Sequence, residues 1–243
     1  MDTVKINKKQ VKMIAHRGLS GIECENTNAA FVAAANRSYY GIETDIHITT
    51  DGRFVILHDS KTTRVCDVEV DVDNSSFNEI KALQLHDPRK HVEEEGVVRR
   101  DLVIPTLEEY LSICKKYDKV AVIELKTDFT GHFERLFETV ESYHSLEKTV
   151  FISFGWKNVV EVRRLLPNQK AQFLCCEWKD ELVEKLKENN LDLDINYPAL
   201  TLEIVQKLHE NGIKVNCWTT DLAQNAEKLV EMGVDYITSN ILE

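Results

Sequence analysis

Residues 214–238 read KVNCWTTDLAQNAEKLVEMGVDYIT, and they decide the fold class because they contain a strand, a helix and a second strand in succession. The runs 214–218 and 234–238 are short and carry β-branched and aromatic residues, which is typical of strands. Asp221 is predicted to cap a helix over 223–232, and Gly233 to end it in a left-handed conformation. A connection through a helix places two strands in parallel, so this stretch predicts a βα unit.

The same alternation of strand and helix continues over almost the whole chain. Strands are predicted at 11–16, 41–48, 54–58, 120–126, 150–154, 172–176, 191–196, 214–218 and 234–238. Helices are predicted at 26–36, 107–117, 132–143, 159–166, 181–189, 202–211 and 223–232, with Thr106 and Thr201 as N-caps and Gly212 as a C-terminal stop. For a chain of 243 residues, this pattern predicts an α/β fold, a TIM-type (β/α)8 barrel formed by residues 1–243 as a single domain.

One of the nine predicted strands must lie outside an eight-stranded barrel. The strands at 41–48 and 54–58 are separated only by residues 49–53, which is too short a connection for parallel neighbours. If Asp51-Gly52 is the two-residue turn of a hairpin, Asp45 lies opposite His58, and Glu43, Asp45 and His58 share one face. His47 also lies on that face, but it lacks a charged sequence neighbour and a direct role is not favoured.

Residues 60–104 interrupt the rhythm of strands and helices and are predicted to form a small insertion. The segment is polar, with the acidic run Glu93-Glu94-Glu95 close to Arg99-Arg100-Asp101. Because it directly follows His58, the insertion is expected to lie over the functional site. A substrate lid and a solvated surface excursion both remain open interpretations.

The composition limits the possible partners and the cellular compartment. A net charge of −11, from 30 basic and 41 acidic residues, argues against nucleic acid as a partner. The six cysteines are scattered and mostly lie in apolar runs, which is typical of buried thiols in a reducing compartment. Residues 1–12 lack the apolar stretch of a secretory signal, and no run approaches the ~18 apolar residues of a membrane span. We therefore expect a cytoplasmic enzyme without stable membrane insertion; the oligomeric state does not follow from the sequence.

Acidic side chains stand at the ends of predicted strands, where barrel enzymes place their chemistry. Glu43 and Asp45 lie on the second predicted strand, and Glu124 lies near the end of the strand at 120–126, two residues before Lys126. Three carboxylates provide a hard oxygen cage, which suits Mg²⁺ or Ca²⁺. Zinc is less favoured, because no paired histidines or cysteines accompany the acids.

Two histidines next to charged residues are the candidates for proton transfer. His16 ends the first strand beside Arg17, and His58 ends the third beside Asp59. Imidazole is the side chain whose unperturbed pKa, ~6.5, lies close to working pH, so the pair can act as acid and base. Arg17 can clamp phosphate oxygens with its planar fork, so together these groups are the equipment for cutting a phosphodiester.

Other polar and aromatic residues are candidates for supporting roles. Glu25 could hold Arg17 in place, and Asn26 could bond a phosphate or a catalytic side chain, or simply cap the helix that follows it. Trp218 and Phe154, each at the end of a predicted strand, offer an aromatic wall for an alcohol or glycerol moiety, or are ordinary core residues.

On these residues the chain resembles the glycerophosphodiester phosphodiesterases, a family of metal-dependent barrel hydrolases. The matching pieces are His16-Arg17-Gly18, Glu25-Asn26-Thr27, Ala30-Phe31, Glu43-x-Asp45, Asp51-Gly52, His58-Asp59, Ile104-Pro105-Thr106-Leu107-Glu108-Glu109, Glu124-x-Lys126, Ser153-Phe154 and Cys217-Trp218-Thr219. The family also has its insertion after the His-Asp pair. The chain departs from the family at Cys24, where proline is common, in the residues after His58-Asp59, and at Thr238-Ser239-Asn240, where the family often has Thr-Asp.

The resemblance implies His16 and His58 as the acid/base pair and Glu43, Asp45 and Glu124 as metal ligands. It further implies that Arg17 and Lys126 contact phosphate. The implied reaction converts a glycerophosphodiester and water into glycerol 3-phosphate and an alcohol such as choline or ethanolamine.

Two other functions remain as alternatives. One is a related phosphodiester-cleaving barrel, either a lysophospholipase D or an enzyme that ends at a cyclic phosphate, for which an apolar lip would be expected in residues 60–104. The other is a catalytically silent barrel that binds polyol phosphates, although both histidines and all three acids are present.

Overall fold

The computed structural model describes residues 2–86 and 99–243, and it contains a closed barrel of eight parallel strands. The order around the barrel is β1-β9-β8-β7-β6-β5-β4-β2, and the pairing of β1 with β2 closes it. The barrel strands are β1 (Lys12–Ala15), β2 (Gly41–Ile48), β4 (Val120–Leu125), β5 (Thr149–Ser153), β6 (Lys170–Cys175), β7 (Asp192–Asn196), β8 (Val215–Trp218) and β9 (Tyr236–Ser239). The predicted TIM-type (β/α)8 barrel is therefore confirmed.

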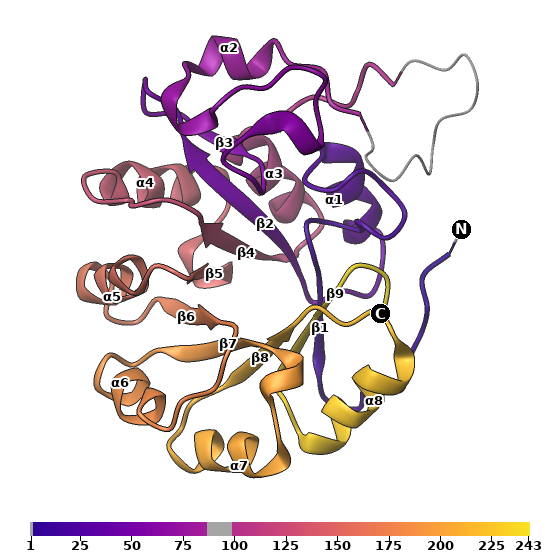
Figure 1. Cartoon of the computed structure of the whole chain (residues 1–243), viewed down its shortest axis with the longest axis vertical. Helices are drawn as coiled ribbons and strands as arrows, with labels where there is room; N and C mark the ends of the chain where they lie inside the picture. The colour runs from indigo at the N-terminus through magenta and orange to yellow at the C-terminus, as the bar shows by residue number, and fades with distance from the viewer. Residues whose placement is uncertain (1, 87–98) are drawn as a thin grey trace.

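Helices lie outside the strands and form the outer ring of the barrel (Figure 1). They are α1 (Asn28–Ala35), α3 (Leu107–Lys116), α4 (Phe133–Tyr143), α5 (Trp156–Leu165), α6 (Leu182–Glu188), α7 (Leu202–Glu210) and α8 (Ala223–Met232). Two 3₁₀ turns, η3 (Leu146–Lys148) and η4 (Tyr197–Ala199), lie in the connections between them. In the part of the chain that the structure describes, no helix is both long and apolar enough to cross a bilayer.

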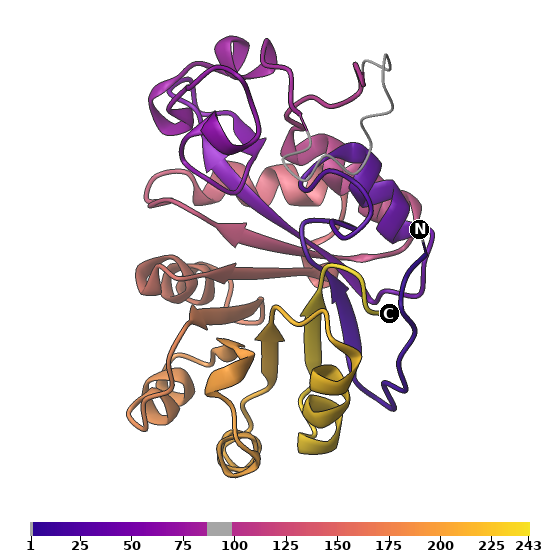
Figure 2. The same ribbon diagram turned by 45° about the vertical axis from the view of Figure 1, so that its right-hand side comes forward.

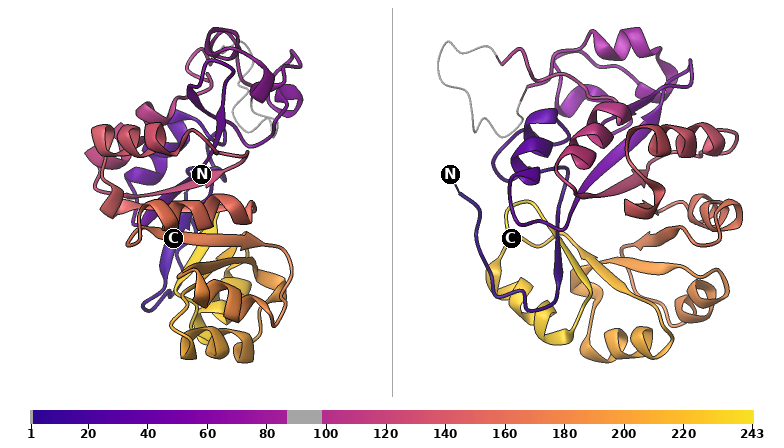
Figure 3. Two further views of the ribbon diagram at one scale, coloured as in Figure 1. Left: turned by 90° about the vertical axis from the view of Figure 1, so that its left-hand side faces the viewer. Right: turned by 180° about the vertical axis from the view of Figure 1, so that it is seen from behind.

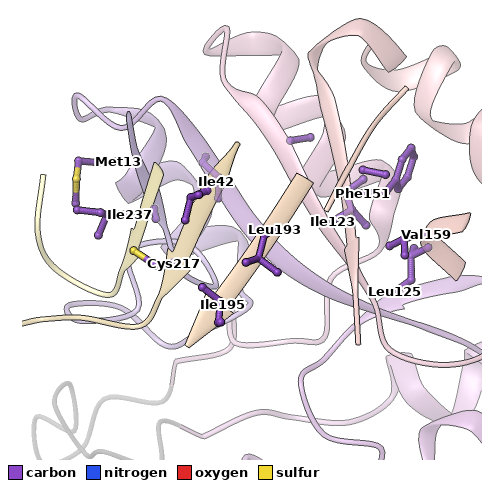
Figure 4. Packing of buried hydrophobic residues seen from close by; sticks show 14 of the residues in the cluster. Met13, Ile42, Ile123, Leu125, Phe151, Val159, Leu193, Ile195, Cys217 and Ile237 are labelled. Atoms are coloured by element: carbon purple, nitrogen blue, oxygen red, sulfur yellow. The ribbon is translucent and has the colours of Figure 1, made fainter. Parts of the chain in front are cut away.

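The alternation of side chains along each strand divides the apolar residues into two layers. Met13, Ile42 and Phe151 belong to the large cluster that the strands form with the helices, and Figure 4 shows part of this packing. Residues of the opposite strand faces, such as Ile14 and Val122, form a smaller separate cluster with Ile152 and Leu174. A one-residue shift of any strand would exchange these two layers, so the pattern fixes the register.

The predicted helix ends are confirmed at four positions and wrong at one. Gly212 directly follows Asn211, the C-cap of α7, with a left-handed φ of +75°. Thr106 forms a capping box with Glu109, and Thr201 accepts a hydrogen bond from the Ile204 amide. Gly233 ends α8 with a φ of +84°. Asp221 does not cap α8, whose N-cap is Leu222; its carboxylate instead accepts hydrogen bonds from the Asn240 amide and side chain, 2.8 and 2.7 Å away.

The predicted hairpin exists, but its predicted register is wrong by one residue. β3 (Phe54–Ile56) runs antiparallel to β2, with Ile46 opposite Ile56 and Ile48 opposite Phe54. The Thr49 amide bonds to the Arg53 carbonyl, so the loop contains three residues, and Gly52 takes the left-handed φ of +75° that such loops require. His58 is therefore not a strand partner of Asp45; it lies two residues beyond the end of β3, where the chain has left the sheet.

The described part of the insertion is packed around its own small core. It contains η1 (Thr62–Arg64), η2 (Val72–Asn74) and α2 (Phe77–Lys81), and its apolar side chains surround Val55 and Leu57 of the hairpin. Figures 2 and 3 show this segment at one end of the molecule, beside the hairpin. The acidic run Glu93-Glu94-Glu95 lies outside the described residues, as does part of the segment in which an apolar lip would be expected.

Candidate active site

A small cavity of about 60 Å³ lies within the barrel at the carboxyl ends of its strands. Its walls are formed by His16, Arg17, Glu43, His58, Glu124, Ile152, Phe154, Leu174, Asp194, Trp218 and Thr238. Seven of the ten predicted site residues therefore line one cavity, whereas Asp45, Lys126 and Asn26 stand behind its wall. A larger hollow of about 400 Å³ beside Lys12 and Lys214 contains none of the predicted residues.

The three predicted metal ligands meet through the pairing of two neighbouring strands. Glu43 and Asp45 project from β2, and the register of β2 with β4 sets Asp45 opposite Glu124. One carboxylate oxygen from each residue lies within 4.8 Å of those of the other two, and all three side chains are buried. Among residues 2–86 and 99–243, this is the one group of three or more acids, histidines or cysteines with such a geometry.

The charges of these acids strongly affect one another. Burial and the neighbouring Asp45 raise the pKa of Glu43 well above its usual value, and the same two causes raise the pKa of Glu124 to about 7. Burial also disfavours the charged form of Asp45, but Lys126 and Arg17 outweigh it and hold the pKa of Asp45 below its usual range.

The donor set fits a hard divalent cation. The three carboxylates supply only oxygen ligands, and Asp45 Oδ1 is buried without a hydrogen-bond partner among the described residues. Lys126 Nζ lies 3.4 Å from this oxygen and 2.9 Å from Glu124 Oε1, so it balances only part of the negative charge. Oxygen ligands of this type match Mg²⁺ or Ca²⁺ better than zinc.

His16 follows β1, and its ring is fixed by the loop after β9. Its Nδ1 lies 2.8 Å from Asn240 Oδ1, and the Asn240 amide nitrogen donates to Asp221, so the oxygen faces the ring. His16 Nδ1 therefore carries the hydrogen, and Nε2 is left as an acceptor. Burial and the adjacent Arg17 lower the pKa of His16 to about 4, which makes the ring neutral at pH 7.

His58 is oriented by its sequence neighbour. Its Nδ1 lies 2.6 Å from Asp59 Oδ1, and since a carboxylate only accepts, Nδ1 carries the hydrogen and Nε2 is free. Burial lowers the pKa of His58, while Asp45 and Asp59 oppose this effect by favouring the imidazolium. Both rings therefore present an unprotonated Nε2 when they are neutral.

Arg17 is held against the acids by its backbone and its side chain. Its φ of +53° turns the Arg17 amide toward Glu43, which accepts at 2.8 Å. The guanidinium donates to Glu25 Oε1 at 2.9 Å, as the sequence predicted, and Nε lies 3.5 Å from Asp45 Oδ2. Arg17 thus lies among three acids, to which its backbone amide and its guanidinium are both directed.

Asn26 does not cap α1, because the N-cap is Thr27. Asn26 instead adopts a φ of +54°, and its buried amide nitrogen donates to Asp45 Oδ2 at 2.8 Å. Its side-chain oxygen accepts from the Thr44 hydroxyl at 2.9 Å. The described contacts therefore place Asn26 beside a candidate metal ligand rather than on the cavity wall.

Aromatic and aliphatic side chains form the opposite wall. The rings of Phe154 and Trp218 meet edge to face with their centroids 5.7 Å apart, and Ile152 and Leu174 adjoin them in the cavity lining. The Phe154 side chain is exposed, so this pair is not ordinary core packing. His47, by contrast, is buried outside the cavity and bonds to Asp73 of η2 at 2.9 Å.

The sequence analysis did not identify Asn240 and Asp194 as residues of this site. Asn240 orients His16, but it follows the last strand and lies 224 positions away in sequence. Asp194 is buried on β7 and lines the cavity, and its Oδ1 has no hydrogen-bond partner among the described residues. The only sequence signal for Asp194 is its place in the middle of β7, where polar residues alternate with Leu193 and Ile195.

Comparison with known proteins points to one family. The chain matches the glycerophosphoryl diester phosphodiesterase family over residues 16–242. A glycerophosphodiester phosphodiesterase of Caldanaerobacter subterraneus subsp. tengcongensis is 30% identical over 232 residues, with 94% of this chain and 93% of that protein covered.

Solved structures with the same architecture include a phosphodiesterase from Oleispira antarctica in complex with the product sn-glycerol-3-phosphate. Its TM-score is 0.86 at 23% identity, covering 98% of this chain and 96% of that chain. A glycerophosphodiester phosphodiesterase from Parabacteroides distasonis has a TM-score of 0.79 at 27% identity, with 95% and 93% covered.

Proposed function

Because the chain belongs to the glycerophosphoryl diester phosphodiesterase family and is a phosphoric diester hydrolase, we propose that it hydrolyses glycerophosphodiesters by metal-dependent His/His acid-base catalysis. The proposed substrates are glycerophosphocholine and glycerophosphoethanolamine, and the products are glycerol 3-phosphate and the free alcohol. The observation that carries this proposal is the convergence of two histidines with free Nε2 atoms and a buried three-carboxylate cluster on one cavity.

The charged groups of the cavity suit a phosphodiester. Glu43, Asp45 and Glu124 would hold Mg²⁺ or Ca²⁺, and a bound cation would supply positive charge for the phosphoryl oxygens. Arg17, positioned by Glu25, contacts the phosphate with its remaining N–H groups, and Lys126 adds positive charge from behind the wall. These groups stabilise the charge that develops on the oxygens as the phosphorus is attacked.

The histidines move the protons of the reaction. One neutral imidazole takes a proton at Nε2 from the attacking hydroxyl group, that of water or of the glycerol, while the new P–O bond forms. The other ring, as the imidazolium, gives its proton to the oxygen of the departing alcohol as that P–O bond breaks. Attack by water gives glycerol 3-phosphate directly; attack by the glycerol hydroxyl gives a cyclic phosphate, which a water molecule then opens to glycerol 3-phosphate. Asn240 and Asp59 keep the Nδ1 hydrogens in place, so each ring exchanges protons only through Nε2.

The apolar wall suits the uncharged part of the substrate. We propose that Trp218 and Phe154 pack against the glycerol or alcohol carbons, opposite the phosphate. The sn-glycerol-3-phosphate held by the Oleispira antarctica phosphodiesterase supports glycerol 3-phosphate as the product that leaves this cavity.

We also propose a single catalytic domain over residues 1–243, because β1 and β9, from the two ends of the chain, pair in the barrel. A cytoplasmic location is proposed from the six free cysteines.

The first experiment measures release of glycerol 3-phosphate from the two proposed substrates with Mg²⁺, Ca²⁺ or EDTA present. We expect metal-dependent release that is lost in His16→Ala. Release that is unaffected by EDTA would contradict the metal assignment, and no release under any condition would contradict the substrate class. If neither substrate is hydrolysed, lysophospholipids are tested next. Phosphorus NMR of the products would detect a persistent cyclic phosphate, which would favour the enzyme that ends at a cyclic phosphate.

A further inference from the structure

Arg64 of η1 joins two carboxylates that adjoin the proposed catalytic groups. Its Nη1 and Nη2 donate to the two oxygens of Glu25 at 2.9 and 2.8 Å, and its Nε donates to Asp59 Oδ2 at 2.6 Å. All three nitrogens of the guanidinium are thus engaged with acids. Such bidentate pairs fix both distance and orientation, which a single ammonium cannot do.

Each of these carboxylates has a second partner in the cavity wall. Glu25 Oε1 also accepts from Arg17 Nη1 at 2.9 Å, and Asp59 Oδ1 contacts His58 Nδ1 at 2.6 Å. A single carboxylate therefore connects Arg64 to each of two proposed catalytic-site residues: Glu25 connects it to Arg17, and Asp59 connects it to His58. These groups come from three separate parts of the chain: the loop after β1, the segment after β3 and the insertion.

The shared carboxylate is the shielded member of this arrangement. The Glu25 side chain is 15% exposed, whereas that of Arg64 is 38% exposed and reaches Glu25 from the solvent side. Arg64 and Arg17 share Glu25, and without Arg64 the carboxylate would be free to rotate about its remaining contact with Arg17. Asp59 would likewise lose the donor that fixes its second oxygen, and the His58 ring would lose its fixed orientation.

We propose that Arg64 is a positioning residue through which the insertion sets the orientation of both His58 and Arg17. The proposal rests on the proposed function, since it gives the insertion a role in that reaction. It predicts two separable effects. Loss of the contact with Asp59 should slow the chemical step, and loss of the contact with Glu25 should weaken substrate binding.

Arg99 provides a matched control in the same insertion. It also pairs with two acids, Asp101 at 2.7 Å and Glu23 at 3.4 Å, and these are not the two acids that Arg64 binds. Replacement of Arg99 therefore removes two ion pairs of the insertion and leaves the bonds of Arg64 to Glu25 and Asp59 in place.

The experiment compares Arg64→Met, Arg64→Lys and Arg99→Met with the wild type at saturating metal, after thermal unfolding has shown that each variant is folded. We expect Arg64→Met to lower kcat/KM by about 10- to 100-fold, the usual scale for loss of an orienting partner, and Arg99→Met to change it less than about threefold. Lysine should restore only part of the loss, and added guanidinium should raise the activity of Arg64→Met but not of Arg99→Met.

The two effects are separated by single replacements and by a measurement that does not require turnover. Asp59→Asn should lower mainly kcat, Glu25→Gln should raise mainly KM, and Arg64→Met should do both. Nitrogen-15 NMR of histidine-labelled protein should show a change in the His58 ring signals in Arg64→Met and none in Arg99→Met.

Equal activity of Arg64→Met and Arg99→Met, or unchanged His58 signals in Arg64→Met, would overturn the positioning role. A loss without guanidinium rescue would also overturn it, because the effect would then be structural. If the wild type itself releases no product, the proposed function fails, and the NMR comparison still decides whether Arg64 orients His58.

Discussion

The two walls of the cavity come from different parts of the barrel and differ in chemistry. The ends of β1, β2 and β4, with the segment after β3, contribute His16, Arg17, Glu43, His58 and Glu124. The later strands β5 to β9 contribute mainly apolar and aromatic side chains, namely Ile152, Phe154, Leu174 and Trp218, together with Asp194 and Thr238. One wall is charged and the other is mostly neutral.

The walls also differ in how their polar groups are satisfied. On the charged wall, Glu25, Asn26, Asp59 and Asn240 each hold a cavity residue or a neighbouring acid by a hydrogen bond. On the neutral wall, Asp194 Oδ1 and Trp218 Nε1 are buried without hydrogen-bond partners among residues 2–86 and 99–243. Arg17 Nε and Asp45 Oδ1 of the charged wall also lack hydrogen-bond partners among the described residues, so both walls retain polar groups for a ligand. The walls differ in that hydrogen bonds from neighbouring residues fix the side chains of the charged wall before substrate arrives.

Replacement of either histidine tests the charged wall most strongly. We expect His16→Ala and His58→Ala each to lower turnover at least ~10²-fold with the fold intact, because each removes one proton-transfer group. The measurement is the rate of glycerol 3-phosphate release, with circular dichroism as a check of folding. His132→Ala serves as a control, since His132 lies before α4 and outside the cavity; near-normal rates in both active-site variants would disprove the assignment.

The metal cluster is tested by Glu124→Gln. Loss of one charged oxygen ligand should weaken binding of Mg²⁺ or Ca²⁺ at least ~10-fold, as measured by isothermal titration calorimetry. Glu134→Gln on α4 removes an equal charge outside the cluster and should leave the affinity unchanged. Equal affinities in the two variants would remove Glu124 from the ligand set.

The neutral wall is tested by Trp218→Ala. Removal of the ring should raise KM by about 10-fold with a smaller change in kcat, because the lost contact is made with the substrate as well as with the transition state. Phe154→Ala should have a weaker effect of the same kind, since the residue is 46% exposed. A fall in kcat at constant KM would instead place Trp218 among the groups that act on the chemical step.

Asp194→Asn concerns stability rather than turnover. Burial and the nearby Glu124 raise the pKa of Asp194 well above its usual value, so the folded state holds a proton that the unfolded chain releases above about pH 4. This carboxyl therefore lowers the free energy of unfolding as pH rises, and the asparagine variant lacks that penalty. We expect Asp194→Asn to be more stable than the wild type by at least about 1 kcal/mol at pH 8 and to show a smaller advantage at pH 5.

Urea unfolding at the two pH values, in the presence of EDTA, measures this difference. A constant difference between pH 5 and pH 8 would show that Asp194 is already ionised in the folded protein. In that case the neutral wall would carry a permanent charge, and the contrast between the walls would be smaller than the structure indicates.

The charged wall was easier to predict than the neutral one for a physical reason. His16-Arg17, Glu43-x-Asp45, His58-Asp59 and Glu124-x-Lys126 are local patterns, and the carboxyl ends of parallel strands converge at one end of a barrel. The fold class followed from periodicity in the same local way. The partners of these residues were mostly not predictable, because Asn240 and Arg64 reach them only through contacts between distant segments.

The sequence by itself determined the alternation of strands and helices, the barrel class and the identity of the charged groups, because these depend on side-chain periodicity and residue chemistry over short spans. Only the tertiary structure decided the hairpin register, in which the three-residue loop sets Ile46 opposite Ile56 as the last strand pair and leaves His58 beyond the sheet. It likewise decided that Asp221 orients Asn240 instead of capping α8, and that Arg64 reaches Glu25 and Asp59. These contacts depend on which hydrogen-bonding groups the fold brings together in space. A buried polar side chain must form hydrogen bonds, and its available partners are those that lie near it in the folded chain.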